Sequence, residues 1–566
     1  MAKKQQAGML SLGFVNGGLN VRSGQIALKS NQTRKASNIS LQLEGGFTKV
    51  PGFTAVCTLP TPIQGLMLYQ RGGSNSSPKG QSSYEILAYH YSYISKVDVK
   101  TGTYQTLKNN LHAEGRPQHA QDNAGNLHIV DGVNAPSYYN GSTITGITWP
   151  PTYTATVSTQ QPNSIYWTGS NPTLTSVPID CTFYANRMWY VTDIDNGMGF
   201  FSKASKAGGT ASTDFQTNDG TPTPVDIAGP MQLPVRVPLT GIEATPNGIM
   251  VYSGSTTGRI LGQNPSGLGV GDDFRYESIN NTVGCLSPHL LGKMSDNEQI
   301  VVSNNGVFQM TLSENFQEVI PGGLSYDIQP EFDAIGRYCM SQGQLLIAPH
   351  TGIALLATPR RSSHIWLDKL WVYHFGVGVK AGLDRFGNAK EFPWMANEFF
   401  GGTPTSIKGM IVDPSDNSIY IAIGDTIYKW SGTSFLDSGS IRSEYQFPPN
   451  AFGASGLNKY IKAYWILYKS SSGATFRLDH AWDNGDGGST EITVPAKTVA
   501  EVGTSAILGT SPVTFKSAFS DSAQRYAIAG GQIGKNLIVS FLHDSATEDL
   551  TIYDIQIEYE LMGTGA

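Results

Sequence analysis

Three acidic residues, Asp384, Glu391 and Asp413, are the best candidates in this chain for cleaving a glycosidic bond. That reaction uses a pair of carboxyl groups, one as a general acid and the other as a base or nucleophile. A chain with 44 acidic residues contains such triples without any catalytic purpose. The turn Ser-x-Asp-x-Gly-x-Thr-Trp, typical of sialidases, is absent. We therefore expect no enzymatic activity, with glycan cleavage as the alternative.

Motifs that activate a serine or hold a phosphate are also missing. The pentapeptide Gly-x-Ser-x-Gly, which places a nucleophilic serine on a strained turn, does not occur. The run from Gly531 to Asn536 lacks the Ser or Thr of a phosphate-binding loop and leads into an expected strand, so it indicates a turn. The glycines from Gly267 to Gly271 lack the βαβ context of a dinucleotide site. The sequence predicts no cofactor.

Metal-ligand patterns are weak. His112 and His119 lie seven residues apart, which is not a helical ligand spacing. The oxygen-rich turns at 193–197 and 483–491 could hold calcium, but neither has the 12-residue ligand pattern, and turn residues need no ion. The cysteines form no Cys-x-x-Cys pair. We expect no metal site, and we expect buried free thiols at Cys57, Cys181, Cys285 and Cys339.

Aromatic clusters and a basic pair are the remaining candidates for binding. The aromatic residues could stack on sugars, but alternating aromatics on a strand favour core packing. Arg360-Arg361 indicates a solvated loop, although a ring of subunits would multiply the pair and bring it against nucleic-acid phosphates. The clusters are Tyr89, Tyr91 and Tyr93, and Trp366, Trp371 and Tyr373.

Length, charge and hydropathy exclude several classes of protein. The chain has 566 residues, too many for one hydrophobic core, and only 14% are charged against a usual level of about 25%. The net charge of −6 gives no electrostatic reason to bind a polyanion. We find neither an apolar stretch long enough to span a membrane nor the apolar segment of a secretion signal. We expect a soluble protein made in a cytoplasm.

Short strands and turns dominate the pattern, and helical periodicity is nearly absent. The sequence predicts an all-β fold with seven recurring hairpins. Units that start at 126, 186, 247 and 297 follow one another at 60, 61 and 50 residues. A repeat of this length is typical of β-propeller blades, and we expect about six to eight, with sandwich or barrel repeats as the alternative.

Both ends of the chain depart from this repeat. Residues 1–53 are expected to form an extended arm and the start of the first strand, and 54–440 the propeller. After 441 the strands lengthen, and the last one alternates cleanly between apolar and polar residues. We expect a C-terminal antiparallel β-sandwich at 441–566, with Ile555, Ile557, Tyr559 and Leu561 on its buried face.

One motif near the start is more specific. Gly17-Gly18-Leu19-Asn20 and Asn38 precede a Gly-x-x-Lys-x-Pro-Gly stretch, in which we expect the proline to fix an extended bend and the second glycine to permit a left-handed turn. This opening resembles tail nozzle (tail hub) proteins of short-tailed bacteriophages, where a similar stretch leads from an arm into a propeller. We call this stretch the assembly motif; its residues are Gly45, Gly46, Lys49, Pro51, Gly52 and Phe53.

Further similarities follow in order along the chain. They lie at 127–141, 183–202, 283–308 and 441–469, while the long segments at 152–177 and 384–402 depart from the pattern. The resemblance implies a noncatalytic virion protein, made in the host cytoplasm, that forms a ring of six copies below the portal and adaptor proteins. It implies contacts with tail fibre or spike proteins, and passage of double-stranded DNA without specific binding. It predicts no residues for the DNA channel.

Two other functions stay open. One is a carbohydrate-binding or glycan-cleaving propeller of a phage or bacterial surface, which would lose turnover when an acid such as Asp384 is replaced. The other is a monomeric interaction scaffold. If the arm has no core of its own, deleting it before Phe53 should leave the propeller folded but unable to assemble.

Overall fold

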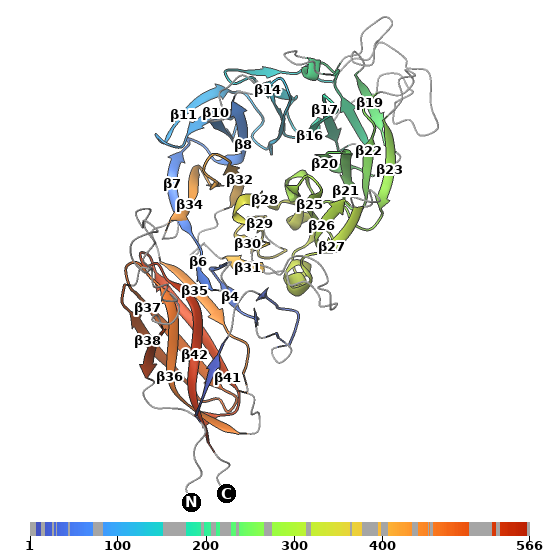
Figure 1. Ribbon diagram of the computed structural model, residues 1–566. Coiled ribbons are helices and arrows are strands. Elements are labelled where there is room, and N and C mark those ends of the chain that lie inside the picture. Colours follow the sequence, from blue (N-terminus) through green and yellow to red (C-terminus); the bar gives the residue numbers. More distant parts are fainter. Residues whose placement is uncertain are drawn as a thin grey trace, which may run out of the picture.

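The chain folds into a ring of β-sheets and a β-sandwich beside it (Figure 1). The computed structural model describes residues 7–12, 17–24, 28–29, 31–42, 46–71, 83–150, 177–193, 197–204, 211–215, 228–233, 237–264, 274–312, 319–362, 365–375, 394–397, 406–432, 440–450, 452, 457–496, 523–527 and 533–562. The predicted all-β class and the propeller are confirmed. In this described part, no helix is both long and apolar enough to cross a bilayer.

The ring is a propeller with seven four-stranded blades in the described residues. In each of the first four blades, consecutive strands pair antiparallel from the axis outward. These strands are β8 (Ile63–Arg71), β9 (Ser83–His90), β10 (Tyr93–Asp98) and β11 (Thr103–Lys108); β12 (Gln118–Gln121), β13 (Leu127–Val130), β14 (Ser137–Tyr139) and β15 (Ile144–Gly146); β16 (Pro178–Tyr184), β17 (Arg187–Thr192), β18 (Met198–Phe201) and β19 (Gly229–Gln232); and β20 (Leu239–Thr245), β21 (Gly248–Ser253), β22 (Thr257–Leu261) and β23 (Arg275–Asn280).

The seventh blade closes the ring with a strand from the other end of the chain. Its three inner strands come from residues after 406, and its outermost strand is β7, which pairs antiparallel with β34. The strands of blades five to seven are β24 (Leu291–Ser295), β25 (Glu298–Ser303), β26 (Gly306–Leu312) and β27 (Val319–Gly323); β28 (Gln344–Ala348), β29 (Ile353–Thr358), β30 (Lys369–Tyr373) and β31 (Trp394–Asn397); and β32 (Ile407–Asp413), β33 (Ser418–Ile423), β34 (Thr426–Gly432) and β7 (Gly52–Thr58).

Burial explains the composition of the blades. The second strand of a blade lies between two neighbouring sheets, so all six residues of β17 and of β21 are buried and both strands are rich in apolar and aromatic residues. The outer strand β11 is largely exposed and reads Thr-Tyr-Gln-Thr-Leu-Lys. Aromatic rings link the layers, as where Trp189 meets Phe274 with centroids 4.8 Å apart.

Side chains accept hydrogen bonds from backbone N–H groups at the open edges of the innermost strands. The innermost strands of the seven blades contact one another in a closed circle, β8 to β12 and onward through β32 back to β8. His119 accepts a hydrogen bond from the backbone N–H of Leu68 (3.3 Å), and Asp180 accepts one from that of Ile242 (2.8 Å). Each of these bonds joins two blades, so donors that would otherwise be unpaired are used.

Asp180 makes the stability of the propeller depend on pH. Burial raises the pKa of Asp180 to about 8, against about 4 in an unfolded chain. The folded protein therefore keeps a proton that the unfolded chain has released, and the resulting stabilisation is complete below pH 4 and is lost as the pH rises towards 8. We expect the free energy of unfolding to fall over this interval relative to Asp180→Asn, in urea titrations at several pH values. Parallel profiles for the two proteins would contradict this assignment.

The sandwich consists of two sheets. In the first, the order is β39-β36-β42-β6-β5, with β1 on β42 and β40 on β36; in the second, it is β38-β37-β41-β35-β4. The strands are β35 (Ile441–Gln446), β36 (Asn458–Lys469), β37 (Ala474–Trp482), β38 (Gly487–Val494), β39 (Ala523–Ala527), β40 (Ile533–Gly534), β41 (Leu537–Ser545), β42 (Thr551–Met562), β1 (Ala7–Ser11), β4 (Ala36–Ser37), β5 (Ile39–Leu41) and β6 (Phe47–Lys49). Of the expected buried face, Ile555 and Ile557 are buried, and Tyr559 and Leu561 are partly exposed.

Four strands of the N-terminal segment belong to the sandwich, so these described residues do not form a separate extended arm. Strands β1, β4 and β6 pair with strands of the C-terminal region, and β5 pairs with β6. The side chains of Ile39, Leu41 and Phe47 lie in the same core as Ile557. Short strands of two to five residues cannot fold alone, so pairing with the long strands stabilises them. The propeller begins with β7 at Gly52, and the sandwich resumes at Ile441.

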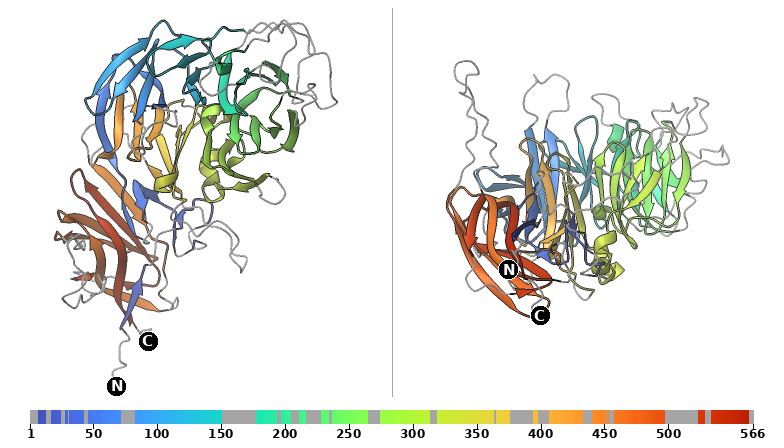
Figure 2. Two further views of the ribbon diagram at one scale, coloured as in Figure 1. Left: turned by 45° about the horizontal axis from the view of Figure 1, so that its top comes forward. Right: turned by 60° about the horizontal axis from the view of Figure 1, so that its bottom comes forward.

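A short parallel pair and several short helices make up the other regular elements of the described residues. A two-stranded parallel pair, β2 (Gly18–Leu19) with β3 (Gln32–Thr33), lies near the short helices between blades five and six, where Val21 donates a backbone hydrogen bond to Asp327. The described helices are η2 (Ala211–Thr213), η4 (Pro288–Leu290), η5 (Tyr326–Ile328), α1 (Gln329–Asp333), α2 (Arg337–Ser341) and η6 (Pro349–Thr351). Figure 2 shows the sandwich beside the rim of the ring.

Candidate functional site

The assembly motif lies where the chain passes from the sandwich into the propeller. Thr48 pairs with Thr551 in the sandwich, whereas Gly52 pairs with Gly432 in the seventh blade. Only Val50 and Pro51 separate β6 from β7, so the motif connects the two domains directly. Phe53 anchors the propeller side, buried with its ring centroid 6.0 Å from that of Tyr428. Gly45 lies outside the described residues.

The two described glycines of the motif differ in their roles. A Cβ on Gly46 would lie 2.6 Å from the carbonyl oxygen of Ile552, so β42 approaches too closely for any side chain there. Gly52 does not adopt the left-handed conformation that we expected. It is the first residue of an extended strand, because the chain continues from β6 through Pro51 into β7 without turning back.

Lys49 joins β6 to the turn between β41 and β42. Its Nζ donates a hydrogen bond to the carbonyl oxygen of Ser545 (2.7 Å), and the neighbouring Thr48 hydroxyl donates to the carbonyl of Leu550 (2.8 Å). Burial lowers the pKa of the Lys49 ammonium, and the acidic residues of the turn partly offset this effect. The lysine therefore fixes the position of the turn relative to the motif.

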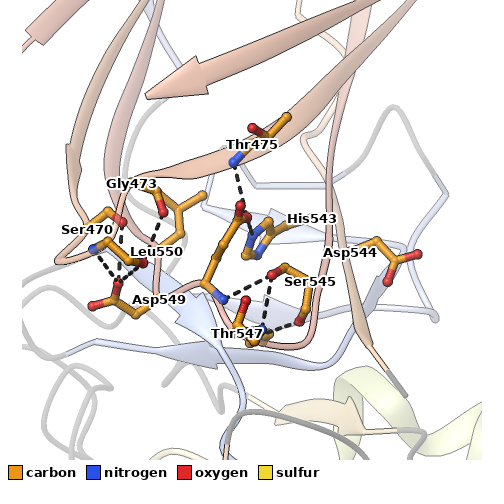
Figure 3. Close-up of polar contacts among 12 residues, drawn as sticks. Ser470, Gly473, Thr475, His543, Asp544, Ser545, Thr547, Asp549 and Leu550 are labelled. Atoms are coloured by element: carbon orange, nitrogen blue, oxygen red, sulfur yellow. Dashed lines mark hydrogen bonds and ion pairs between the residues drawn. The ribbon is translucent and has the colours of Figure 1, made fainter. Parts of the chain in front are cut away.

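The turn itself is held by its acidic side chains (Figure 3). Asp549 accepts hydrogen bonds from the backbone N–H of Ser471 (2.9 Å) and the hydroxyl of Ser470 (3.3 Å). Glu548 accepts one from the N–H of Thr475 (3.1 Å) and lies 3.1 Å from Nε2 of His543. Because these carboxylates are used to fix the loop, the acidic cluster has a structural role.

A groove of about 1050 Å³ opens beside this junction. It lies between the sandwich and blades six and seven, and its walls combine apolar, hydroxyl, amide and charged side chains. The described residues that line it are Ser40, Leu41, Gln42, Pro51, Pro349–Ile353, His374, Asn417–Ile419, Lys429–Ser431, Lys469, Asp549, Thr551 and Tyr553. The assembly motif therefore borders a recess large enough to receive another molecule.

The propeller axis holds a second, smaller cavity of about 300 Å³. Side chains cross the axis and divide it. Arg116, just before blade two, donates to the carbonyl oxygens of Gln342 (3.0 Å) and Gly343 (3.2 Å), just before blade six. Nε2 of Gln118 lies 3.1 Å from Nδ1 of His289. Side chains of the described residues therefore bridge the axis.

The electrostatics of the axis do not favour acid–base catalysis. Burial lowers the pKa of His119 to about 4 and that of Arg116 to about 10, so the imidazole is neutral and the guanidinium charged at neutral pH. None of the described residues that line this cavity is a carboxylate. The pair of acids that a glycosidase needs is therefore not found in the described lining.

The other predicted candidates are dispersed. Asp413 accepts hydrogen bonds from Ser415 in the turn after β32, and Asp384 and Glu391 lie outside the described residues. His112 is in an exposed turn, whereas His119 bonds to Leu68. No group of three potential metal ligands gathers among the residues that the structure describes.

Of the two oxygen-rich turns, only the one at 483–491 lies wholly within the described residues. Asp483 accepts a hydrogen bond from the N–H of Lys535 (3.1 Å) and another from the side-chain amide of Asn536 (3.1 Å), so its oxygens are already engaged. Of the turn at 193–197, residues 194–196 lie outside the described part, as do 267–271 and 531–532 of the glycine-rich runs.

Side-chain burial decides the remaining assignments. All four cysteines are buried free thiols, as expected. Tyr89, Trp371 and Tyr373 are core residues, but Tyr91 and Trp366 are exposed. Arg360 forms an ion pair with Asp368 (3.1 Å), and Arg361 is exposed.

The sequence did not predict three residues that matter at the propeller axis and in the groove. Arg116, His374 and Trp430 were not singled out, because their partners or surroundings come from segments hundreds of residues away. The Gly-Arg-Pro turn between the two histidines was the available signal for Arg116. No local pattern marks His374 or Trp430.

No protein-family model and no curated protein matches the chain. Among solved structures, YCF48 from Cyanidioschyzon merolae is 9% identical over 67% of this chain and 98% of its own, with a TM-score of 0.36. The extracellular domain of a hybrid two component system from B. thetaiotaomicron is 10% identical over 80% and 57%, at 0.39. The C-terminal WD40 domain of Sif2 is 10% identical over 67% and 99%, at 0.35. Likenesses this distant carry no argument about what this chain does.

Proposed function

We propose that this chain is a noncatalytic structural subunit of a bacteriophage tail, a nozzle or hub that assembles into a closed ring of six copies. The observation that carries the proposal is the order of parts along the chain: the assembly motif, the propeller and the sandwich follow one another as in the tail nozzle proteins that the sequence resembles. The motif also forms the direct connection between the two domains.

Because side chains bridge the propeller axis of each subunit, DNA would need another path through a ring of six copies. Arg116 and Gln118 cross the propeller channel, so a DNA duplex would pass along the axis of the six-subunit ring, between subunits. The net charge of −6 favours passage without tight binding, because few phosphates would be neutralised. In this proposal, the ring retains the packaged genome and conducts it during ejection.

The proposal also specifies location and neighbours. The protein is made in the host cytoplasm and resides in the virion tail, where the ring attaches below the portal and adaptor proteins and carries tail fibres or spikes. No cofactor or metal is needed for this role. The competing proposal, a glycan-binding or glycan-cleaving propeller, needs neither a ring nor a neighbouring tail protein.

We expect the purified protein to form a closed sixfold ring with an axial opening, alone or when mixed with the other tail proteins. Light scattering after size-exclusion chromatography measures the number of copies, and negative-stain imaging shows the opening. Oligosaccharide screening of the same preparation, with Asp413→Asn as the matched variant, addresses the competing function. A protein that stays monomeric and never joins a tail would refute the ring, and turnover of a glycan would favour the alternative.

A further inference from the structure

Two buried polar side chains in the groove at the domain junction each have a nitrogen without a hydrogen-bond partner in the described part of the chain. His374 is 3% exposed and Trp430 is 9% exposed, and both line the groove. Neither Nε2 of His374 nor Nε1 of Trp430 has a hydrogen-bond partner among the residues that the structure describes. Burying a polar group without a partner is costly, so native structures seldom do it without a reason. Burial also lowers the pKa of His374 to about 4, which leaves a neutral imidazole at pH 7.

The groove also borders the edge of a sheet. Strand β5 is the last strand of the first sandwich sheet. The backbone of Asn38 accepts a hydrogen bond from Val50, and Gln42 donates one to Gly46, so the even-numbered residues of β5 face β6. The N–H and C=O of Leu41, which lines the groove, therefore point away from β6. No backbone bond from the described residues reaches them, and such an edge can pair with an added strand.

The charge and volume of the groove restrict the kind of molecule that it can bind. Lys469 lines the groove, is exposed, and has no ion pair among the described residues. Lys429 lies 3.5 Å from Asp416, and the carboxylate of Asp549 is used by Ser471. The charge left without a partner is therefore positive. A volume of about 1050 Å³ is just above the range for small-molecule sites, roughly 300–1,000 Å³, and could hold several residues of a peptide chain.

We propose that this groove binds an extended acidic peptide segment of a partner protein. The peptide adds a strand to the edge of β5, its polar groups pair with Trp430 and His374, and a carboxylate lies against Lys469. The N-terminal residues of a second copy fit less well, because Lys3 and Lys4 repeat the charge of the groove. This binding does not require the chain to form a tail ring, so the two proposals can fail separately.

The test uses the full chain and a displayed library of random decapeptides. We expect enriched peptides to share a strand-forming core with at least one acidic residue. For a synthetic copy of the best one, fluorescence anisotropy should show about a tenfold weaker Kd with His374→Leu, which corresponds to about 1.4 kcal/mol. The thermal stability of His374→Leu should equal or exceed that of the parent protein, because an unpaired polar group has been removed.

A charge reversal at an exposed residue provides a second variant, whose effect on binding would not result from misfolding. Lys469→Glu changes an exposed side chain and should abolish the preference for acidic peptides. The matched control, Lys100→Glu, alters an exposed lysine in the first blade and should bind as the parent protein does. The proposal is overturned if no peptide is enriched, if the groove variants bind as tightly as the parent, or if the groove residues are needed only for a glycan.

Discussion

Replacing Phe47 with alanine is expected to lower the free energy of unfolding of the sandwich by about 3–5 kcal/mol. The ring of Phe47 is 2% exposed and stacks on Tyr445 with centroids 5.4 Å apart. It also meets Phe541 edge-on at 5.1 Å and Phe447 at 6.3 Å. Removing it leaves a cavity in the centre of the sandwich core, where the surrounding long strands cannot easily close.

Chemical denaturation followed by near-ultraviolet circular dichroism measures this loss. Tyr104→Ala provides the control, because Tyr104 is an exposed aromatic residue on the outer strand of the first blade and its removal should change stability by less than about 0.5 kcal/mol. If Phe47→Ala unfolds like the parent protein, the N-terminal segment does not contribute to the sandwich core.

The second large effect concerns closure of the propeller within one chain. Two truncations test it. Removing residues 1–51 eliminates the N-terminal strands of the sandwich but keeps β7, so the propeller should stay closed. Removing residues 1–58 also deletes β7, with its buried Phe53 and Cys57, and leaves the edge of β34 unpaired. We expect this longer truncation to lose cooperative unfolding of the propeller and to aggregate through the free edge.

Hydrogen exchange at residues 426–432 distinguishes the two truncated proteins directly. The amides of β34 that bond to β7 should be protected when only 1–51 are removed and should exchange rapidly when 1–58 are removed. Equal protection in both would show that the seventh blade does not need β7. The shorter truncation also revises our expectation for the arm, because it should weaken the sandwich as well as assembly.

Local signals predicted the hairpins well, because a hairpin is specified by its turn and its two strands. Ala185 and Asn186 both have positive φ, 51° and 58°, and connect β16 directly to β17. Asn417, with φ of 59°, lies in the turn before β33. Asparagine adopts this conformation more readily than most residues, so the expected hairpins at 186 and 417 begin within a residue of β17 and β33.

Pairings between distant segments could not be read in the same way. Strands β4, β5 and β6 contain two or three residues each and have no periodicity of their own. Strands β4 and β6 pair with β35 and β42, some 400 to 500 residues later, and β5 pairs with β6. Gly52 illustrates the consequence: its neighbours suggested a turn, but pairing with Gly432 keeps it extended.

The candidate groove could not be predicted from local sequence patterns either. It gathers residues from the N-terminal strands, two blades and the sandwich. His374 follows an ordinary blade strand and Trp430 occupies one, and each carries a buried nitrogen with no hydrogen-bond partner among the described residues. A sequence records which groups a residue carries, whereas an unmet hydrogen bond is a property of the folded surroundings.

The position of β7 also determines when the protein can finish folding during synthesis. Thr58 in β7 and Thr426 in β34 are 368 residues apart, and Ala7 pairs with Glu560 near the very end of the chain. At a ribosomal rate of about 5–20 residues per second, β7 waits roughly 20–70 s for its partner. During that time its edge is open to other nascent chains. Contacts this distant also make folding slow, so the yield of native protein should depend on translation rate and on chaperones that cover the waiting strand.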